Sequence, residues 1–196
     1  MTTSLEQQLR DVGALKEGHF LLASGLHSDR YIEKFDLLRN PAATEAALTG
    51  LADTYKYLGI DVVVGPTTGG VILAFELARQ LGASAAFAER KENGSPGREF
   101  RRGTRFEPGT RVLVIDDILT TGGSIRETLA ALTDQEVEVA GIAVLVDRSA
   151  GRTHFPEAPL TAILALHVDV WDSEVCPLCE AGVPLTKPGT TAAGPK

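Results

Sequence analysis

The residues with the most chemistry lie between Arg111 and Ser124, which read RVLVIDDILTTGGS. Four apolar residues, Val112 to Ile115, are typical of a strand buried on both faces of a sheet. Asp116 and Asp117 follow, and they place two carboxylates where that strand is expected to end. Such a pair can accept hydrogen bonds from sugar hydroxyls or act beside a metal ion.

Small and hydroxylated residues come next, just before a helical pattern: Thr120, Thr121, Gly122, Gly123 and Ser124. A turn of this kind exposes unpaired N–H groups, and the helix dipole adds roughly half a positive charge there. Ligands of open α/β sheets bind at the carboxyl ends of strands, so we expect a phosphate at this turn. The acid pair would repel phosphate, whereas a sugar phosphate satisfies both halves of the motif. The alternative interpretation is an ordinary buried strand followed by a turn.

A second glycine-rich turn, GPTTGG at residues 65–70, follows a predicted strand at 61–64 and precedes a predicted helix at 71–81. It is not a P-loop, because Val71 stands where that motif requires lysine. Two such turns at neighbouring strand ends can bind two phosphate groups of one ligand. Thr67, Thr68 and Gly69 are therefore candidate binding residues, and a simple turn is the alternative.

The charge of the chain is uneven. The formal net charge is −7, yet residues 90–105 carry six basic and two acidic residues, a local charge of +4. Arg90 and Lys91 open this stretch, and the sequence NGSPG at 93–97 predicts a mobile loop within it. A cationic loop in an acidic protein suits a small polyanion such as pyrophosphate, although a solvated charged face is the alternative.

The bulk composition limits the possible classes of protein. A chain of 196 residues with 43% hydrophobic content predicts one domain, over residues 1–186, followed by a disordered tail at 187–196. The negative charge argues against nucleic-acid and membrane-surface partners. No apolar run approaches the roughly 18 residues of a membrane helix, and the N-terminus lacks a signal-peptide pattern. We therefore expect a cytoplasmic protein.

Strand and helix patterns alternate along the chain, which predicts a mostly parallel α/β sheet flanked by helices. Helices are expected at 3–14, 41–58, 71–81 and 124–133. Strands are expected at 61–64, 84–88, from 111, at 137–146 and at 160–166, with shorter extended pieces at 20–22 and 31–32.

The cysteines and histidines give a weaker signal. Cys176 and Cys179 form a CPLC sequence, which is half of a zinc site, and the chain offers no second cysteine pair. Two reduced thiols that shape a C-terminal turn are the favoured interpretation, with a zinc site shared across a dimer or a redox pair as alternatives. The four histidines, His19, His27, His154 and His167, show no metal-ligand spacing in the sequence. His27 is a candidate for lining the pocket, and we interpret His154 and His167 as structural or exposed.

Residues 116–124, DDILTTGGS, resemble the binding motif for phosphoribosyl pyrophosphate (PRPP) of type I phosphoribosyltransferases. The resemblance extends to orotate phosphoribosyltransferases in GHFLLASGLHSDRY at 18–31, FAER at 87–90, RRG at 101–103, VDRS at 146–149 and CPLC at 176–179. It implies that fold, with a central mostly parallel sheet and a small hood formed by the N- and C-terminal segments. It also implies transfer of the ribose 5-phosphate of PRPP to orotate, with release of pyrophosphate.

The resemblance assigns roles to individual residues. Asp116, Asp117, Arg90 and Lys91 are the catalytic candidates. The PRPP-binding set adds Ile118, Leu119, Thr120, Thr121, Gly122, Gly123, Ser124, Thr67, Thr68 and Gly69, and the orotate-binding set is Thr120, Arg148 and Tyr31. Arginine suits orotate because its planar fork can pair with a carboxylate. The family further implies Mg²⁺ held mainly through PRPP, and a homodimer with a shared active site.

Three departures from the family pattern affect the loops. Ala23 and Gly69 stand where relatives place lysines, and no histidine follows Lys91 in the basic loop. We hypothesise that one of three arginines (Arg98, Arg101 and Arg102) supplies the missing charge. Two alternative functions remain in view: a purine-base phosphoribosyltransferase of the same fold, and a non-catalytic PRPP-sensing regulator.

Overall fold

The computed structural model describes residues 4–92 and 94–188. The chain divides into two compact units, one formed by Met1–Leu37 with His167–Lys196 and the other by Leu38–Leu166. Helix α2 (Lys34–Leu38) ends where the second unit begins. Each unit is described by itself.

The larger unit is built on a six-stranded sheet with the order β5-β4-β3-β6-β7-β8. Five strands run parallel, and the short β5 pairs antiparallel with the end of β4. The strands are β3 (Val62–Pro66), β4 (Ser84–Arg90), β5 (Arg98–Glu99), β6 (Arg111–Leu119), β7 (Glu138–Asp147) and β8 (Leu160–Ala165).

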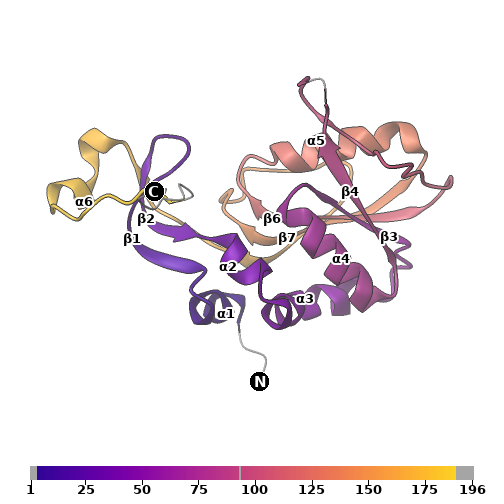
Figure 1. Ribbon diagram of the computed structural model, residues 1–196, viewed down its shortest axis with the longest axis horizontal. Coiled ribbons are helices and arrows are strands. Elements are labelled where there is room, and N and C mark those ends of the chain that lie inside the picture. Colours follow the sequence, from indigo (N-terminus) through magenta and orange to yellow (C-terminus); the bar gives the residue numbers. More distant parts are fainter. Residues whose placement is uncertain (1–3, 93, 189–196) are drawn as a thin grey trace, which may run out of the picture. The chain divides into compact units, whose positions relative to one another are not determined.

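Helices cover both faces of this sheet (Figure 1): α3 (Pro41–Tyr55), α4 (Gly69–Leu81) and α5 (Gly123–Leu132), the last followed by a short 3₁₀ turn at Thr133–Gln135. Every second residue of the central strands, such as Val112 and Val114 of β6, packs in one core cluster with Ile125 and Leu129 of α5. The intervening residues, such as Leu113, are equally buried. Because both faces are covered, the strands are apolar throughout, as the sequence indicated.

The direction in which the chain adds successive strands reverses at the centre of the sheet, between β3 and β6. From β3 the chain passes through α4 to β4 on one side, and from β6 it passes through α5 to β7 on the other. At such a point, the crevice beyond the carboxyl ends of the two strands is where α/β proteins bind ligands. Both glycine-rich turns lie at this edge, after β3 and β6.

The smaller unit contains a three-stranded antiparallel sheet, β1 (Leu15–Leu21), β2 (His27–Ile32) and β9 (Val170–Trp171). Helix α1 (Leu5–Asp11) precedes it, and a 3₁₀ turn (Ser173–Val175) and helix α6 (Pro177–Glu180) follow it. Residue Thr186 bridges back to Phe20 of β1. The N- and C-terminal segments therefore form one unit, as the predicted hood requires.

The predicted fold class is confirmed, whereas some predicted boundaries were wrong. The first helix ends at Asp11, because Gly13 adopts φ +72°. Strand β6 continues through Leu119, so the acid pair lies inside the strand; pairing of Ile118 and Leu119 with β7 extends it. Asn40 caps α3 as predicted, by accepting from the Ala43 N–H at 3.2 Å.

Two sequence predictions remain open. That residues 1–186 act as one domain stays a prediction, and the predicted tail lies, from residue 189 onward, outside the described residues. No helix within the described part of the chain has the length and apolar character needed to cross a bilayer.

Candidate active site

The acid pair of β6 is buried and held by hydrogen bonds. Asp116 and Asp117 are only 6% and 4% exposed. Asp116 accepts from the Ser124 hydroxyl and, at 2.8 Å, from the Asp117 N–H. Asp117 in turn accepts from the Ile118 N–H at 2.8 Å. These contacts fix both carboxylates at the carboxyl edge of the sheet, and Ser124 links the pair directly to the first turn of α5.

The turn between β6 and α5 is open to solvent and has the form of an anion site. Thr120, Thr121 and Gly123 are exposed, and no side chain caps the N-terminus of α5. Gly122 occupies the N-cap position with φ +79°, and a Cβ there would lie 2.8 Å from the Phe155 ring. Glycine is therefore required at this position, both for the backbone and for space. The uncapped N–H groups of a ten-residue helix can bind phosphate.

A segment that the sequence reasoning missed supports this turn. The Thr153 hydroxyl donates to the Thr120 carbonyl at 3.2 Å. Arg126 of α5 stacks over the Phe155 ring at 4.9 Å and donates to the His154 carbonyl at 2.9 Å. No motif marks residues 153–155, so only the folded chain identifies them.

The turn between β3 and α4 is closely packed. A Cβ on Gly65 would lie 2.0 Å from the Gly70 carbonyl oxygen, and a Cβ on Gly69 would lie 2.0 Å from an Asp117 carboxylate oxygen. Thr67 donates its N–H to the Ala88 carbonyl of β4 at 3.0 Å, and the Thr67–Thr68 peptide is cis. The glycines thus bring this turn against the acid pair, which places the two predicted binding segments together.

Arg98 is the buried cation of this edge. Its side chain is 3% exposed, and its Nη1 donates to the Thr67 hydroxyl at 3.0 Å and to the Ala88 carbonyl at 3.1 Å. Its Nε lies 3.3 Å from a carboxylate oxygen of Glu127 on α5. Burial lowers the pKa of Arg98, and Glu127 and Asp116 act against that shift. A guanidinium stays protonated in proteins, so Arg98 contributes a fixed positive charge that links the β3–α4 turn to α5.

The other two arginine candidates have a different partner. Arg101 and Arg102 lie 3.1 Å and 3.2 Å from the same Glu89 carboxylate oxygen, and Arg101 also pairs with Glu92. The hydrogen bond from Arg102 and the charge of Arg101 hold the pKa of Glu89 below its usual range, against the effect of burial. Of the three arginines, Arg98 is the one bonded to a phosphate-binding candidate.

Arg90 and Lys91 lie at the end of β4 and are exposed. Arg90 pairs with Arg98 in the antiparallel β4–β5 ladder, and the Lys91 N–H donates to the Gly97 carbonyl at 3.4 Å. Because β4 is parallel to β3 and β6, both cations belong to the same edge of the sheet as the two turns. Asn93, within the predicted loop, lies outside the described residues.

The candidates for base recognition are divided between the units. Arg148 follows β7, and its N–H donates to the Leu119 carbonyl at 2.8 Å, so Arg148 and Thr120 follow adjacent strands. Tyr31 lies on β2 of the smaller unit, with its ring 5.8 Å from that of Phe20. His27 is in the same unit and is buried there against His19, rather than lining an open pocket of that unit.

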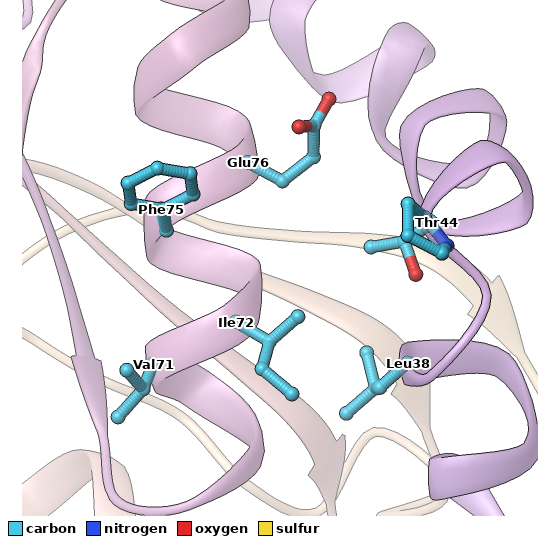
Figure 2. A pocket seen from close by; sticks show the side chains of 7 residues that line it. Leu38, Thr44, Val71, Ile72, Phe75 and Glu76 are labelled. Carbon is cyan, nitrogen blue, oxygen red and sulfur yellow. The ribbon is translucent and has the colours of Figure 1, made fainter.

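A pocket of about 460 Å³ between α3 and α4 has a different character (Figure 2). Its lining is mostly apolar and includes Val71, Ile72 and Phe75 of α4 together with Leu38, toward which Ile72 points. Its one charged lining residue is Glu76, whose pKa is lowered by a hydrogen bond from Arg79. An apolar pocket with an anionic edge does not suit a phosphate, so this pocket is not a candidate for the predicted phosphate site.

Comparison with known proteins identifies the family. Residues 36–164 match the phosphoribosyl transferase domain. The orotate phosphoribosyltransferase of Thermoanaerobacter sp. (strain X514) is 43% identical over 179 residues, covering 91% of this chain and 92% of that protein. The orotate phosphoribosyltransferase of Thermotoga maritima is 41% identical over 186 residues, covering 95% of this chain and 97% of that protein.

Solved structures agree. The orotate phosphoribosyltransferase of Aeropyrum pernix superposes with a TM-score of 0.68 at 28% identity, over 83% of this chain and 93% of that one. An adenine phosphoribosyltransferase of Rhodothermus marinus superposes with a TM-score of 0.65 at 23% identity, over 82% of this chain and 99% of that one, which supports the fold alone. This chain belongs to the type I phosphoribosyltransferase family, among the orotate phosphoribosyltransferases.

Proposed function

We propose that this chain transfers the ribose 5-phosphate of PRPP to orotate, which yields orotidine 5′-monophosphate and pyrophosphate for pyrimidine biosynthesis. The observation that carries the proposal is the pairing of two buried carboxylates, Asp116 and Asp117, with the uncapped N-terminus of α5. The helix end suits the 5′-phosphate and the carboxylates suit the ribose hydroxyls, so one sugar phosphate satisfies the whole motif.

The two turns divide the substrate between them. Thr120 to Ser124 offer hydroxyls and N–H groups to the 5′-phosphate, while Ile118 and Leu119 set the path of the strand beneath it. Thr67, Thr68 and Gly69 face the pyrophosphate, where Arg98 holds Thr67 and adds positive charge. The hydrogen bond from Ser124 to Asp116 couples the phosphate end of the site to the ribose end.

Catalysis by these residues is electrostatic and positional. Breaking the bond between C1 of the ribose and pyrophosphate builds positive charge on the ring and negative charge on the leaving group. Asp116 and Asp117 lie where they favour the cationic ring. Arg90 and Lys91 neutralise the leaving group and exclude water, whose attack on the ring is the obvious side reaction. No covalent nucleophile is needed.

The donor set is compatible with Mg²⁺. Carboxylate oxygens are the ligands that this ion prefers, and it usually keeps water and substrate oxygens in its shell. We therefore propose, as the family resemblance implies, that the ion is held mainly through PRPP. When bound, Mg²⁺ would neutralise charge on the pyrophosphate.

Base selection rests on Arg148 and Thr120, which follow adjacent strands, and Tyr31 of the smaller unit is the third candidate. The Arg148 guanidinium can pair with the carboxylate that orotate has and purines lack. We therefore expect Arg148→Gln to lose orotate turnover while PRPP binding persists. In a purine-base enzyme of this fold, the same substitution would leave turnover of the base unchanged.

The assay that tests the proposal is orotate consumption, followed by ultraviolet absorbance with PRPP and Mg²⁺. Adenine, hypoxanthine, xanthine and uracil serve as parallel substrates. We expect turnover of orotate alone. Turnover of a purine would refute the base assignment, and PRPP binding without any turnover would favour the sensing role instead.

We also propose a homodimer with a shared active site, in which Lys91 of one subunit serves the partner's site, while the buried Arg98 stays with the β3–α4 turn of its own subunit. The test is to mix two inactive variants, Lys91→Ala and Asp116→Asn/Asp117→Asn. If sites are shared, exchange of subunits restores about a quarter of wild-type sites, because half the dimers are mixed and half their sites are intact. Absence of any recovery, with a dimer shown by light scattering, would contradict sharing. A cytoplasmic location likewise stays a prediction.

A further inference from the structure

Four potential metal ligands meet inside the smaller unit. His19, His27, Cys176 and Cys179 bring their ligand atoms within 4.8 Å of one another. His19 Nε2 lies 2.8 Å from His27 Nδ1 and 3.5 Å from the Cys176 sulfur. The Cys179 sulfur lies 3.8 Å from His19 Nε2 and 3.3 Å from His27 Nδ1. Both cysteines are free thiols.

The fold assembles this cluster from separate parts of the sequence. His19 lies in β1 at the irregularity in register between Glu17 and Phe20, and His27 begins β2, where it pairs with Leu21 of β1. The two imidazoles meet across this antiparallel pair of strands. Cys176 and Cys179 come from the turn that begins α6, with the two-residue spacing of a zinc knuckle. The spacing of the cysteines indicates half of such a site, but sequence spacing does not identify the histidines, which are eight positions apart and about 150 positions before the cysteines.

The nitrogen–sulfur separations match a tetrahedral zinc site. With Zn–N near 2.0 Å and Zn–S near 2.3 Å, tetrahedral ligands lie about 3.4 Å apart for N–N, about 3.6 Å for N–S and about 3.8 Å for S–S. The observed N–S distances of 3.3, 3.5 and 3.8 Å bracket the expected value. The N–N distance of 2.8 Å is shorter, as for a hydrogen bond between the two rings.

The surroundings orient the ligands for a metal. His19 Nδ1 lies 2.7 Å from the Val183 carbonyl, which can only accept, so Nδ1 carries the proton and Nε2 presents its lone pair to the cluster. A backbone carbonyl on the far nitrogen is the usual partner of a metal-binding histidine. His19, His27 and Cys176 are 3%, 5% and 3% exposed, so their polar atoms are buried around a common centre.

We propose that His19, His27, Cys176 and Cys179 bind one Zn²⁺ in a closed structural site. Two thiolates and two imidazoles form a donor set that selects zinc, and four protein ligands leave no position for a substrate. All four come from one chain, which replaces both the shared-site alternative and the favoured interpretation of two thiols that merely shape a turn. The metal would join the C-terminal segment to the β1–β2 hairpin in a unit with a small core of its own.

The first test is the zinc content of the full-length protein, purified after expression with added zinc and measured by inductively coupled plasma mass spectrometry. We expect about one Zn²⁺ per chain, as one closed site requires. His19→Ala and Cys176→Ser/Cys179→Ser should lose the metal. His167→Ala is the matched control, because His167 belongs to the same unit but is 79% exposed and pairs with Asp169.

The second test reads the ligands directly and needs no variant to fold. Wild-type protein is stripped with a chelator under reducing conditions and loaded with Co²⁺. We expect the strong visible bands of tetrahedral cobalt and a near-ultraviolet thiolate charge-transfer band, both abolished by adding Zn²⁺. A metal-free protein as purified, a weak octahedral cobalt spectrum, or a Cys176–Cys179 disulfide that forms with no loss of zinc would each overturn the proposal.

Discussion

The two glycine-rich turns occupy equivalent positions, each between a parallel strand and a helix, yet they are built in opposite ways. After β6, the turn is open: Thr120, Thr121 and Gly123 are exposed, and a Cβ on Gly123 would meet nothing nearer than 3.9 Å. After β3, the turn is closed, with space at Gly65 and Gly70 already filled by neighbouring backbone and proline atoms.

This difference indicates how the site divides its work. In the proposed function, the open turn would offer hydroxyls and N–H groups to the 5′-phosphate, which stays bound through the reaction. The closed turn has a closely packed backbone whose Thr67 is bonded to Arg98, and in the proposed function it would lie next to the leaving pyrophosphate. A rigid environment suits a leaving group because it stabilises developing charge without reorganisation.

The acid pair is shared by both turns and should give the largest effect. Asp116→Asn/Asp117→Asn keeps size and hydrogen-bond acceptors but removes both charges, so kcat/KM for orotate should fall about 10³-fold. Thermal unfolding should change little, which separates lost charge from lost structure. A rate within about threefold of wild type would refute the role of the pair.

An alanine substitution in each turn tests whether the β3–α4 turn is more closely packed than the β6–α5 turn. Gly65→Ala places a methyl group 2.0 Å from the Gly70 carbonyl oxygen and should lower the free energy of unfolding by about 3 kcal/mol. Gly123→Ala meets no such contact and should change it by less than about 0.5 kcal/mol. Urea denaturation measures both changes in the free energy of unfolding. Equal changes would contradict the difference in packing between the two turns.

The arginines sharpen the account of the closed turn. Arg98→Lys loses the fork that reaches Thr67, Ala88 and Glu127, so kcat/KM should fall about tenfold to thirtyfold. Arg101→Lys, whose partners are acidic side chains of β4 and its loop, is the matched control and should stay within about threefold. The reverse order would assign the missing charge to Arg101.

The smallest effect concerns Glu89. Its pKa is depressed in the folded state by Arg102 and Arg101, so its stabilising contribution is present above the ordinary glutamate pKa of about 4.3 and is lost as the pH falls through the lowered value. The free energy of unfolding of the wild type should therefore fall more in acid than that of Glu89→Gln. Glu107→Gln, at an exposed position, should follow wild type. Parallel curves for Glu89→Gln and wild type would contradict this ion-pair assignment.

Sequence reasoning could predict the sheet, both turns and the acid pair because each is encoded locally, by an apolar run followed by residues that only a turn or a ligand explains. It placed the end of β6 too early, since pairing with β7 rather than composition sets that end. It named Arg98 only as one of three arginines, and it missed Phe155, Thr153 and the His19–Cys176 contact. These depend on residues far apart in the chain, which no spacing rule relates.

The most direct test of the divided site uses backbone NMR on isotopically labelled protein. Titration with ribose 5-phosphate should shift the amide signals of Gly123, Ser124 and Ile125 at the start of α5, and leave those of Gly69 and Gly70 nearly unchanged. Titration with magnesium pyrophosphate should do the reverse. If ribose 5-phosphate instead perturbs the β3–α4 turn, or neither ligand distinguishes the two turns, the assignment of the 5′-phosphate to the β6–α5 turn is wrong.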